Sequence, residues 1–256
     1  MQKNLASVVS EKANLIWSIA DKITGVYKPH EYGDVILPLT VLKRFDDVLA
    51  DTKDEVLKTA EKYPETFAQR DMILKEASKQ KFYNTSKFNF EKLLDVPSDI
   101  EANLYKYING YSSEVRDIIE NFDLERHIKR MANNGILYST IEAFNSKNAN
   151  LSPKEVSNIE MGYIFEEIIR RFSESSNEEA GQHYTPREVI ELMVNIVFSD
   201  EEDLADSSKI KTVYDGACGT GGILSASIEY ANKLNSSSKM IDLAKISSNF
   251  FLYSFT

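Results

Sequence analysis

The chain has 256 residues, of which 42% are hydrophobic and 27% charged, and this is enough for a buried core in one large domain or two smaller ones. Its formal net charge of -10 argues against binding of nucleic acid over the whole surface, because nonspecific affinity comes largely from Lys and Arg neutralising phosphates. A single cysteine excludes an intramolecular disulfide, the three scattered histidines lack metal-ligand spacing, and no apolar run is long enough for a membrane span, so the sequence predicts a cytoplasmic protein without a metal site or membrane anchor.

Residues 7 to 145 have a mostly helical pattern. In the first helix, apolar residues recur at steps of three and four: Leu15, Ile16, Ile19, Ala20 and Ile23. We expect this helix to end near Tyr27-Lys28-Pro29, because proline cannot continue a helix.

A second helix is expected to begin around Asp34. The apolar residues assigned to the core are Leu37, Val41, Leu42, Phe45, Val48 and Leu49. The charged residues expected to face mostly water are Lys43, Arg44, Asp46 and Asp47. The sequence therefore predicts an amphipathic helix at this position.

A polar stretch over residues 145–150 separates this helical part from the next helix, which Ser152 is expected to cap with Pro153 at its first position. That helix runs to Phe172 and is followed by a polar, acidic loop over residues 173–181. We place the domain boundary in the polar stretch, which gives a helical domain over residues 1–148 and a second domain over residues 149–256.

The segment Gln182-His183-Tyr184-Thr185-Pro186-Arg187-Glu188 carries a strong helix-start signal. Thr185 can cap the helix, Pro186 fits its first turn, and Glu188 completes a capping box. The predicted helix has apolar residues at Val189, Ile190, Leu192, Met193, Ile196 and Val197.

A β-prone run over residues 211–214 precedes the glycine-rich loop Asp215-Gly216-Ala217-Cys218-Gly219-Thr220-Gly221-Gly222, and a helical pattern follows it. Strand, glycine loop and helix open a nucleotide-binding α/β fold. The dinucleotide fingerprint fails because its last glycine position is Leu224, and the P-loop pattern fails because Gly222-Ile223 stands where Lys-Ser/Thr is required. A tight glycine turn without a ligand remains an alternative.

These motifs resemble those of adenine-specific DNA methyltransferases, in the form typical of the modification subunits of type I restriction-modification systems. The glycine loop resembles their S-adenosylmethionine loop, with Gly216 where proline is usual, and the segment from Gln182 to Arg187 resembles their second cofactor motif. Residues 14–17 and 39–46 resemble the family's N-terminal helical domain, so the resemblance covers residues 5 to 230. It implies an α-helical N-terminal domain followed by the start of an α/β, Rossmann-like, S-adenosylmethionine-dependent methyltransferase domain.

The resemblance also implies the cofactor-binding residues. The amino acid end of S-adenosylmethionine would be held by Asp215 and by the main chain of Cys218, Gly219, Thr220 and Gly221. The second motif would wall and orient the cofactor with Gln182, His183, Tyr184, Thr185, Pro186 and Arg187. Cys218 is not favoured as a nucleophile, because no partner base is visible for its thiol. His183 is expected to pack or to form hydrogen bonds and not to act in catalysis.

No catalytic residue is assigned. The family transfers a methyl group to the exocyclic amine of a flipped-out adenine through an Asn/Asp-Pro-Pro-Tyr/Phe loop, and the sequence contains no Pro-Pro pair. Asp242 is a poor candidate for a ribose ligand, and from Ser236 onward the resemblance stops. A truncation after the cofactor loop, or a shifted reading frame, is the expected explanation.

By this resemblance the partners are a specificity subunit and double-stranded DNA in the assembled complex, with a restriction subunit and a second modification subunit as further candidates. Two rival functions remain. One is a noncatalytic assembly or DNA-clamping module, and the other is an unrelated small-molecule methyltransferase, which would make the N-terminal resemblance accidental. Affinity for S-adenosylmethionine separates the first rival from the methyltransferase hypothesis.

Overall fold

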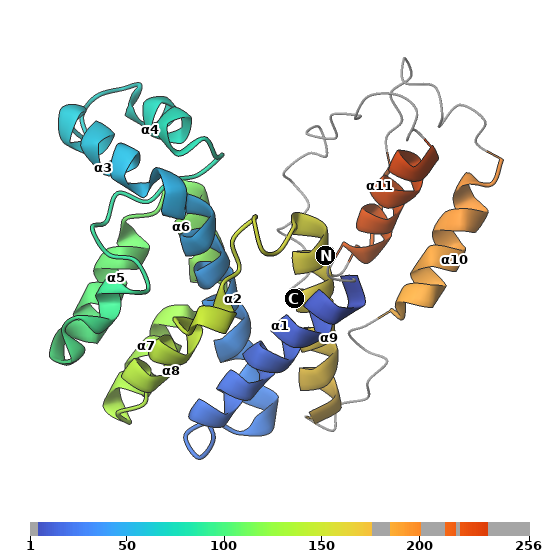
Figure 1. Cartoon of the computed structure of the whole chain (residues 1–256), viewed down its shortest axis with the longest axis horizontal. Helices are drawn as coiled ribbons and strands as arrows, with labels where there is room; N and C mark the ends of the chain where they lie inside the picture. Colours follow the sequence, from blue (N-terminus) through green and yellow to red (C-terminus); the bar gives the residue numbers. More distant parts are fainter. Residues whose placement is uncertain (1–4, 176–184, 201–212, 219–220, 235–256) are drawn as a thin grey trace. The chain divides into compact units, whose positions relative to one another are not determined.

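The computed structural model describes residues 5–175, 185–200, 213–218 and 221–234. The chain divides into two compact units, Met1–Ser176 and Asn177–Thr256. We call them the first and second units and describe each by itself (Figure 1). The described secondary structure is helical in both, and among the described residues the only β-type pairings are two isolated bridges in the first unit.

The first unit contains nine α-helices among its described residues. Their bounds are α1 Leu5–Ile19, α2 Tyr32–Leu49, α3 Lys53–Lys62, α4 Arg70–Ser78, α5 Ile100–Asn109, α6 Ser113–Asn121, α7 Leu124–Asn133, α8 Leu137–Phe144 and α9 Asn158–Ser175. Two helices are described in the second unit, α10 Arg187–Phe198 and α11 Gly222–Leu234. The predicted helical N-terminal part is therefore confirmed.

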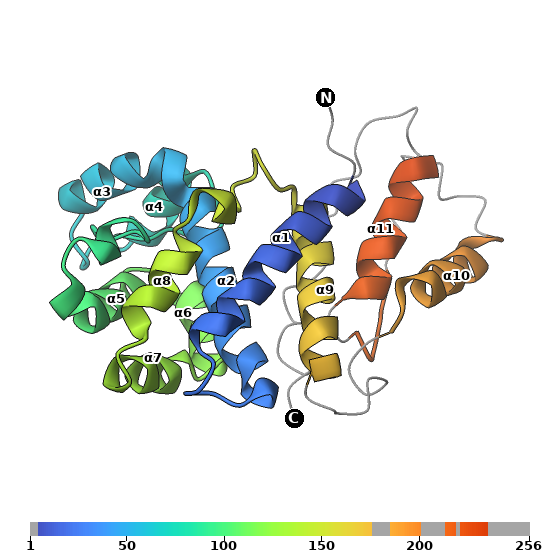
Figure 2. The ribbon, with the colours of Figure 1, turned by 60° about the horizontal axis from the view of Figure 1, so that its bottom comes forward.

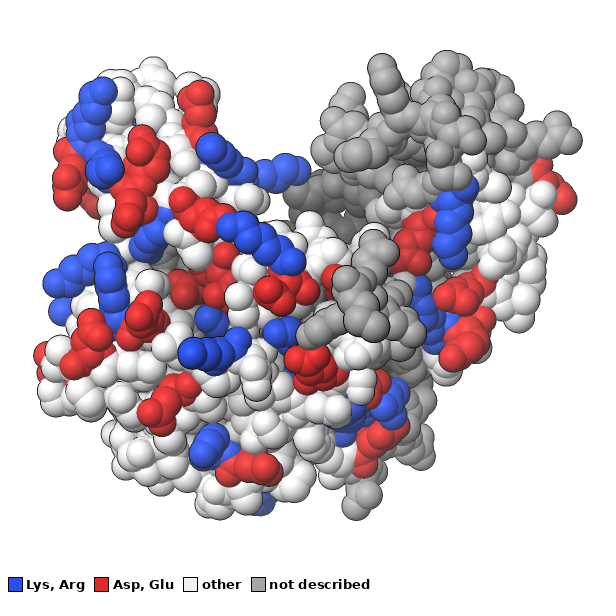
Figure 3. All heavy atoms as spheres, in the orientation of Figure 1, with Lys and Arg blue, Asp and Glu red and all other residues white. Residues whose placement is uncertain are grey.

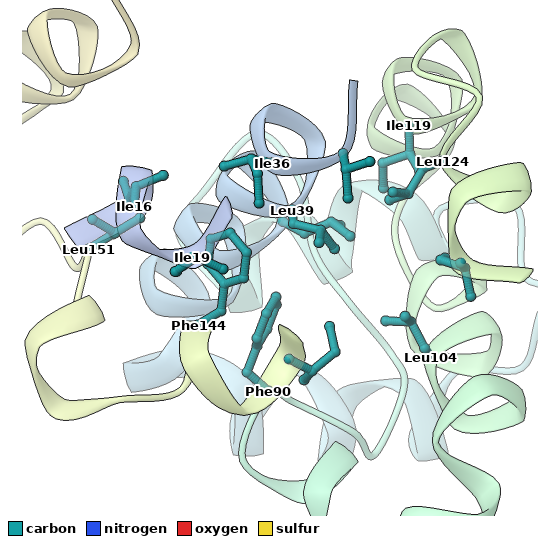
Figure 4. Packing of buried hydrophobic residues seen from close by; sticks show 14 of the residues in the cluster. Ile16, Ile19, Ile36, Leu39, Phe90, Leu104, Ile119, Leu124, Phe144 and Leu151 are labelled. Atoms are coloured by element: carbon teal, nitrogen blue, oxygen red, sulfur yellow. The ribbon is translucent and has the colours of Figure 1, made fainter. Parts of the chain in front are cut away.

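The core of the first unit is one large apolar cluster that α2 crosses. Helix α2 packs against α1, α7, α8 and α9, and α3 and α4 form a hairpin beside it with a small apolar cluster of their own (Figures 1 and 2). Side chains from many segments meet around Leu39 in Figure 4, with Phe90 and Phe144 below it and Leu104 and Leu124 to one side. Burial of these side chains is the main stabilising contribution to this unit.

Helix α9 lies along α1 and belongs to the first unit (Figure 2). The rings of Trp17 and Phe172 have centroids 4.9 Å apart. Arg171 Nη1 also donates to Asn14 Oδ1 at 2.7 Å. The chain between α8 and α9 is held as well, because Lys12 Nζ donates to the carbonyl of Asn148 at 2.7 Å. The boundary proposed between residues 148 and 149 stays a prediction, whereas the division by packing falls between Ser176 and Asn177.

The first helix ends earlier than the sequence suggests. Helix α1 stops at Ile19, and one short helical turn, Ala20–Lys22, follows it. Gly25 then adopts φ +88°, a left-handed conformation that suits glycine and reverses the chain. Ile23 keeps the apolar spacing because it is buried although it lies in the turn after the helix. Periodicity alone therefore overestimates the helix length.

The expectation that the charged residues of α2 face mostly water is wrong. Lys43 and Arg44 are only 6% and 7% exposed. Lys43 Nζ pairs with Asp47 Oδ1 at 2.8 Å, and Asp46 accepts a hydrogen bond from the backbone N of Phe90 at 3.1 Å. Burial raises the pKa of the Asp46 carboxyl. Since α2 has neighbours on several sides, Lys43 and Arg44 are buried and Asp46 and Asp47 are half-buried, and these side chains bond one another and nearby backbone groups.

The expected start of the helix after the polar stretch is also wrong. The carbonyl of Ser152 accepts a hydrogen bond from the backbone N of Val156 at 2.9 Å. This bond closes a single turn that does not continue as a helix. The capping box forms instead at Ser157, whose backbone N donates to Glu160 Oε2 at 2.7 Å while its hydroxyl accepts the backbone N of Glu160 at 3.2 Å. Helix α9 therefore begins at Asn158.

Acidic and basic side chains alternate on the face of the first unit seen in Figure 3, which carries no continuous basic surface. This agrees with the formal charge of -10. Within the described parts of the chain, no helix combines the length and apolar character needed to cross a membrane.

A buried histidine lies where α7 meets the turn after α1. His127 is 3% exposed, its ring centroid is 5.6 Å from that of Tyr27, and its Nδ1 has no hydrogen-bond partner among the described residues. The carbonyl of His127 accepts the Tyr27 hydroxyl at 3.1 Å. Burial, and then the positive charge of Arg126, lowers the pKa of the His127 imidazole.

This lowered pKa predicts a loss of stability in mild acid. The folded state keeps His127 neutral to a lower pH than the unfolded chain does, so the free energy of unfolding should fall as pH falls below the ordinary histidine pKa, by at most about 1.4 kcal/mol per pH unit. Urea unfolding at pH 7.5 and 5.5 measures the change. His127→Gln should reduce this pH dependence, and His30→Gln, at an exposed histidine, should leave it intact. An equal pH dependence in wild type and His127→Gln would contradict the assignment.

Candidate cofactor-binding site

The second unit brings the two predicted cofactor motifs onto neighbouring helices. Helix α10 begins with the last motif residue, Arg187, and α11 begins at Gly222, directly after the glycine loop (Figure 1). The two helices pack against each other through a cluster made by Ile190, Val194 and Ala226. Gln182, His183, Tyr184, Gly219 and Thr220 lie outside the described residues.

The glycine loop turns tightly into α11. Gly221 adopts φ +79°, and its backbone N donates to the carbonyl of Cys218 at 2.7 Å. Because a Cβ at Gly221 would have no atom within 4 Å, the glycine is required by its backbone conformation and not by lack of space. The predicted sequence of glycine loop followed by helix is confirmed at this position, and the half-buried thiol of Cys218 lies within the turn.

Asp215 is the first residue of the loop, and only one of its two carboxylate oxygens has a hydrogen-bond partner among the described residues. Its Oδ1 accepts the backbone N of Ala217 at 3.0 Å, which fixes the orientation of the side chain. Its Oδ2 is buried and has no hydrogen-bond partner among the residues that the structure describes. A buried carboxylate oxygen without a partner is costly, so this atom marks a place where a cationic or hydrogen-bonding group fits.

Thr185 and Pro186 are exposed at the start of α10. The predicted capping box between Thr185 and Glu188 does not form, because Pro186 takes the cap position and makes no side-chain hydrogen bond there. The carbonyl of Pro186 accepts the backbone N of Val189 at 3.0 Å and that of Ile190 at 3.1 Å. The helix thus begins one residue later than a Thr185 cap would place it.

Arg187 pairs with two carboxylates. Its Nε lies 2.9 Å from Glu191 Oε1, one turn along α10, and its Nη2 lies 3.0 Å from Glu229 Oε2 on α11. Sequence reasoning missed Glu229, and no signal in the sequence could have found it, because the two residues are 42 positions apart and meet only through helix packing.

Most of the apolar residues predicted for α10 are not buried. Ile190 is 7% exposed, whereas five others are between 42% and 67% exposed, namely Val189, Leu192, Met193, Ile196 and Val197. Only the face toward α11 is covered among the described residues, where Phe198 also stacks on Tyr230 with centroids 5.8 Å apart.

The predicted strand before the loop is not observed where it can be checked. Val213 and Tyr214 have no strand pairing, Tyr214 is 79% exposed, and residues 211–212 lie outside the described part. A Rossmann-like sheet therefore stays a prediction. Within the described ranges no group of three His, Cys, Asp or Glu side chains could hold a metal ion.

Two family models match successive parts of the chain. The family model described as HsdM N-terminal domain matches residues 12–144, and the model described as N-6 DNA Methylase matches residues 157–246, beyond the position where the sequence resemblance was expected to stop. A curated relative is the "Type I restriction enzyme MjaIX methylase subunit" of Methanocaldococcus jannaschii, 23% identical over 86% of this chain.

The chain spans 39% of the length of that relative. The first family model covers more than half of the chain, and the second covers the motifs that carry Asp215 and Arg187. The order of the two matches, a helical domain before a DNA methylase region, is the order read from the sequence. The chain therefore belongs to the family of methylase (modification) subunits of type I restriction-modification enzymes.

Proposed function

We propose that this chain contributes the S-adenosylmethionine site of a type I DNA methyltransferase that modifies the exocyclic amine of adenine. The carrying observation is the buried, unpartnered Oδ2 of Asp215 at the start of the glycine loop. An ammonium group is the cofactor feature that best satisfies a carboxylate oxygen, through a charge-assisted hydrogen bond. The match to an N-6 DNA Methylase model over residues 157–246 supports this choice of cofactor and reaction.

Each part of the loop has a chemical role in this proposal. Asp215 holds the ammonium, and the backbone from Cys218 through Thr220 to Gly221 holds the carboxylate end near the first turn of α11, where helix N–H groups and the helix dipole favour negative charge. Thr185 and Pro186, both exposed, wall the cofactor from the side of α10. When bound, the cofactor supplies an electrophilic methyl group.

The partners follow from the family. The relative from Methanocaldococcus jannaschii is named a methylase subunit, and we propose that this chain likewise works with a specificity subunit on double-stranded DNA. The formal net charge of -10 favours DNA contact shared with such a partner over binding by this chain alone.

Weak binding of S-adenosylmethionine is expected, with a dissociation constant above the micromolar range. Among the described residues of the loop, Asp215 Oδ2 is the one buried side-chain polar atom without a partner, so few directional contacts offset the cost of ordering a ligand. Asp215→Asn should weaken the affinity about 10- to 100-fold, since a hydrogen bond to a charged group contributes about 1.5–3 kcal/mol. Titration calorimetry at high protein concentration measures both values.

Asp200→Asn is the matched control, because Asp200 is an exposed carboxylate in the same unit and should leave the affinity unchanged. Absence of any binding by the wild type would remove the methyl-donor role and leave the assembly or DNA-clamping function. Equal affinity of wild type and Asp215→Asn would show that the carboxylate does not hold the cofactor.

A further inference from the structure

We propose that Arg187 is a positioning residue which, together with Glu229, locks α10 onto α11 and so fixes the start of α11 behind the cofactor loop. This inference rests on the proposed function of the loop from Asp215 to Gly221. It gives Arg187 a role different from the direct cofactor contact that the sequence resemblance implies.

The contacts of the guanidinium are directed along and between the two helices. Nε of Arg187 bonds Glu191 Oε1 at 2.9 Å within α10, and Nη2 bonds Glu229 Oε2 at 3.0 Å on α11. The side chains of Arg187 and Glu229 are 30% and 20% exposed, whereas that of Glu191 is 53% exposed. The planar guanidinium presents donors in a fixed fork, so two carboxylates can hold its orientation.

A second contact between the same helices lies next to the loop. A Cβ built on Gly222, the first residue of α11, would lie 2.7 Å from Ile190 Cδ1. The start of α11 therefore lies against the tip of the Ile190 side chain, which would have to move if residue 222 carried a Cβ. Gly222 follows Gly221, whose positive φ ends the loop, so a displacement of the start of α11 also displaces the end of the loop.

The two contacts lie at different heights on α11. Ile190 touches its first residue, and Arg187 reaches Glu229 seven positions further along. Two contacts at separated positions restrain the helices against each other more than either contact alone. Pro186 and Gly221 directly precede these two packed helices.

The experiment is a double-mutant cycle with Arg187→Gln, Glu229→Gln and both together in the full chain. Hydrogen–deuterium exchange of α11 amides, read by mass spectrometry, measures how often the helix pair opens. Each single variant should speed exchange about two- to fivefold, as expected for a partly exposed ion pair. The double variant should exchange no faster than either single variant.

Glu188→Gln is the matched control, since it neutralises an exposed carboxylate in the first turn of α10, and exchange in α11 should stay at the wild-type rate. Additive effects in the cycle, or unchanged exchange in Glu229→Gln, would overturn the proposal.

Titration with S-adenosylmethionine separates positioning from direct contact. Positioning requires Arg187→Gln and Glu229→Gln to lower the affinity by the same factor, with no further loss in the double variant. A loss confined to Arg187→Gln would overturn the proposal in favour of a cofactor contact. If the wild type binds no S-adenosylmethionine, the proposed function fails for this chain while the exchange cycle still decides whether the ion pair locks the helices.

Discussion

Arg44→Ala is expected to lower the free energy of unfolding of the first unit by about 3–5 kcal/mol. The Arg44 guanidinium is buried and donates to the carbonyl of Leu151, to the carbonyl of Val156 at 2.8 Å and to Asn158 Oδ1 at 2.8 Å. Burial lowers the pKa of Arg44, which reflects the cost of removing this charge from water. Alanine would leave the carbonyls of the buried Leu151 and Val156 without this donor and open a cavity beside α2.

Chemical unfolding followed by far-ultraviolet circular dichroism measures the change. Arg44→Lys should recover only part of the loss, because one ammonium cannot reproduce the forked geometry toward three acceptors. Arg126→Ala is the control: its side chain is 68% exposed, it pairs with Asp123, and its removal should change stability by less than about 1 kcal/mol. A similarly small effect at Arg44 would show that the segment leading to α9 is held by other contacts.

The Arg44 contacts also explain why the division into two compact units falls after α9. Residues 151–158 join the part matched by the HsdM N-terminal domain model to the part matched by the N-6 DNA Methylase model, which begins at residue 157. Arg44 fastens this link to α2, and α9 then packs on α1. The first element of the methylase match is thereby held in the compact unit of the helical domain.

Apolar periodicity predicted the helical character of the first unit but not the surroundings of α2. Of the six apolar residues assigned to the core, Leu42 and Leu49 are at most 2% exposed, and the other four are only half-buried. The fully buried apolar residues of α2 that the pattern did not assign are Val35, Ile36 and Leu39. It failed at Lys43 and Arg44 because it assumes one wet face, whereas α2 has neighbours on several sides. Buried charges of this kind depend on acceptors more than 100 positions away, such as Val156, which local sequence does not reveal.

The candidate site was predictable in its local motifs and not in its contacts. The order Asp215, glycine turn, helix could be read from residue types, because a left-handed turn needs glycine and a helix start follows it. The pairing of Arg187 with Glu229 and the close approach of Gly222 to Ile190 arise only when two helices pack. The sheet expected around the loop stays a prediction.

Gly110→Ala is expected to be strongly destabilising, by about 3 kcal/mol. Gly110 ends α5, and its carbonyl accepts the backbone N of Thr85 at 2.7 Å. An added Cβ would lie 2.6 Å from both the Cβ and the backbone N of Ser86, and 2.7 Å from Asn84 Oδ1. The glycine is required here by close approach, since its φ of -74° is open to any residue.

The neighbours of Gly110 cannot move aside at low cost. Asn84 is 1% exposed, and its Nδ2 donates to the carbonyl of Tyr107 at 2.9 Å while its Oδ1 accepts the backbone N of Ser86 at 2.8 Å and Lys53 Nζ at 3.0 Å. Relief of the clash would break these buried hydrogen bonds, each contributing about 1 kcal/mol or more.

Gly162→Ala provides a control with the opposite sign. Gly162 lies in α9, is exposed, and a Cβ there meets no atom within 4 Å, so alanine should stabilise the helix by about 0.5–1 kcal/mol. The two variants make the same chemical change, so any difference in their unfolding midpoints reports the space around the glycine. An unfolding midpoint of Gly110→Ala equal to that of the wild type would contradict the prediction. It would mean that the antiparallel bridge between Asn84 and Tyr111 packs more loosely than its hydrogen bonds indicate.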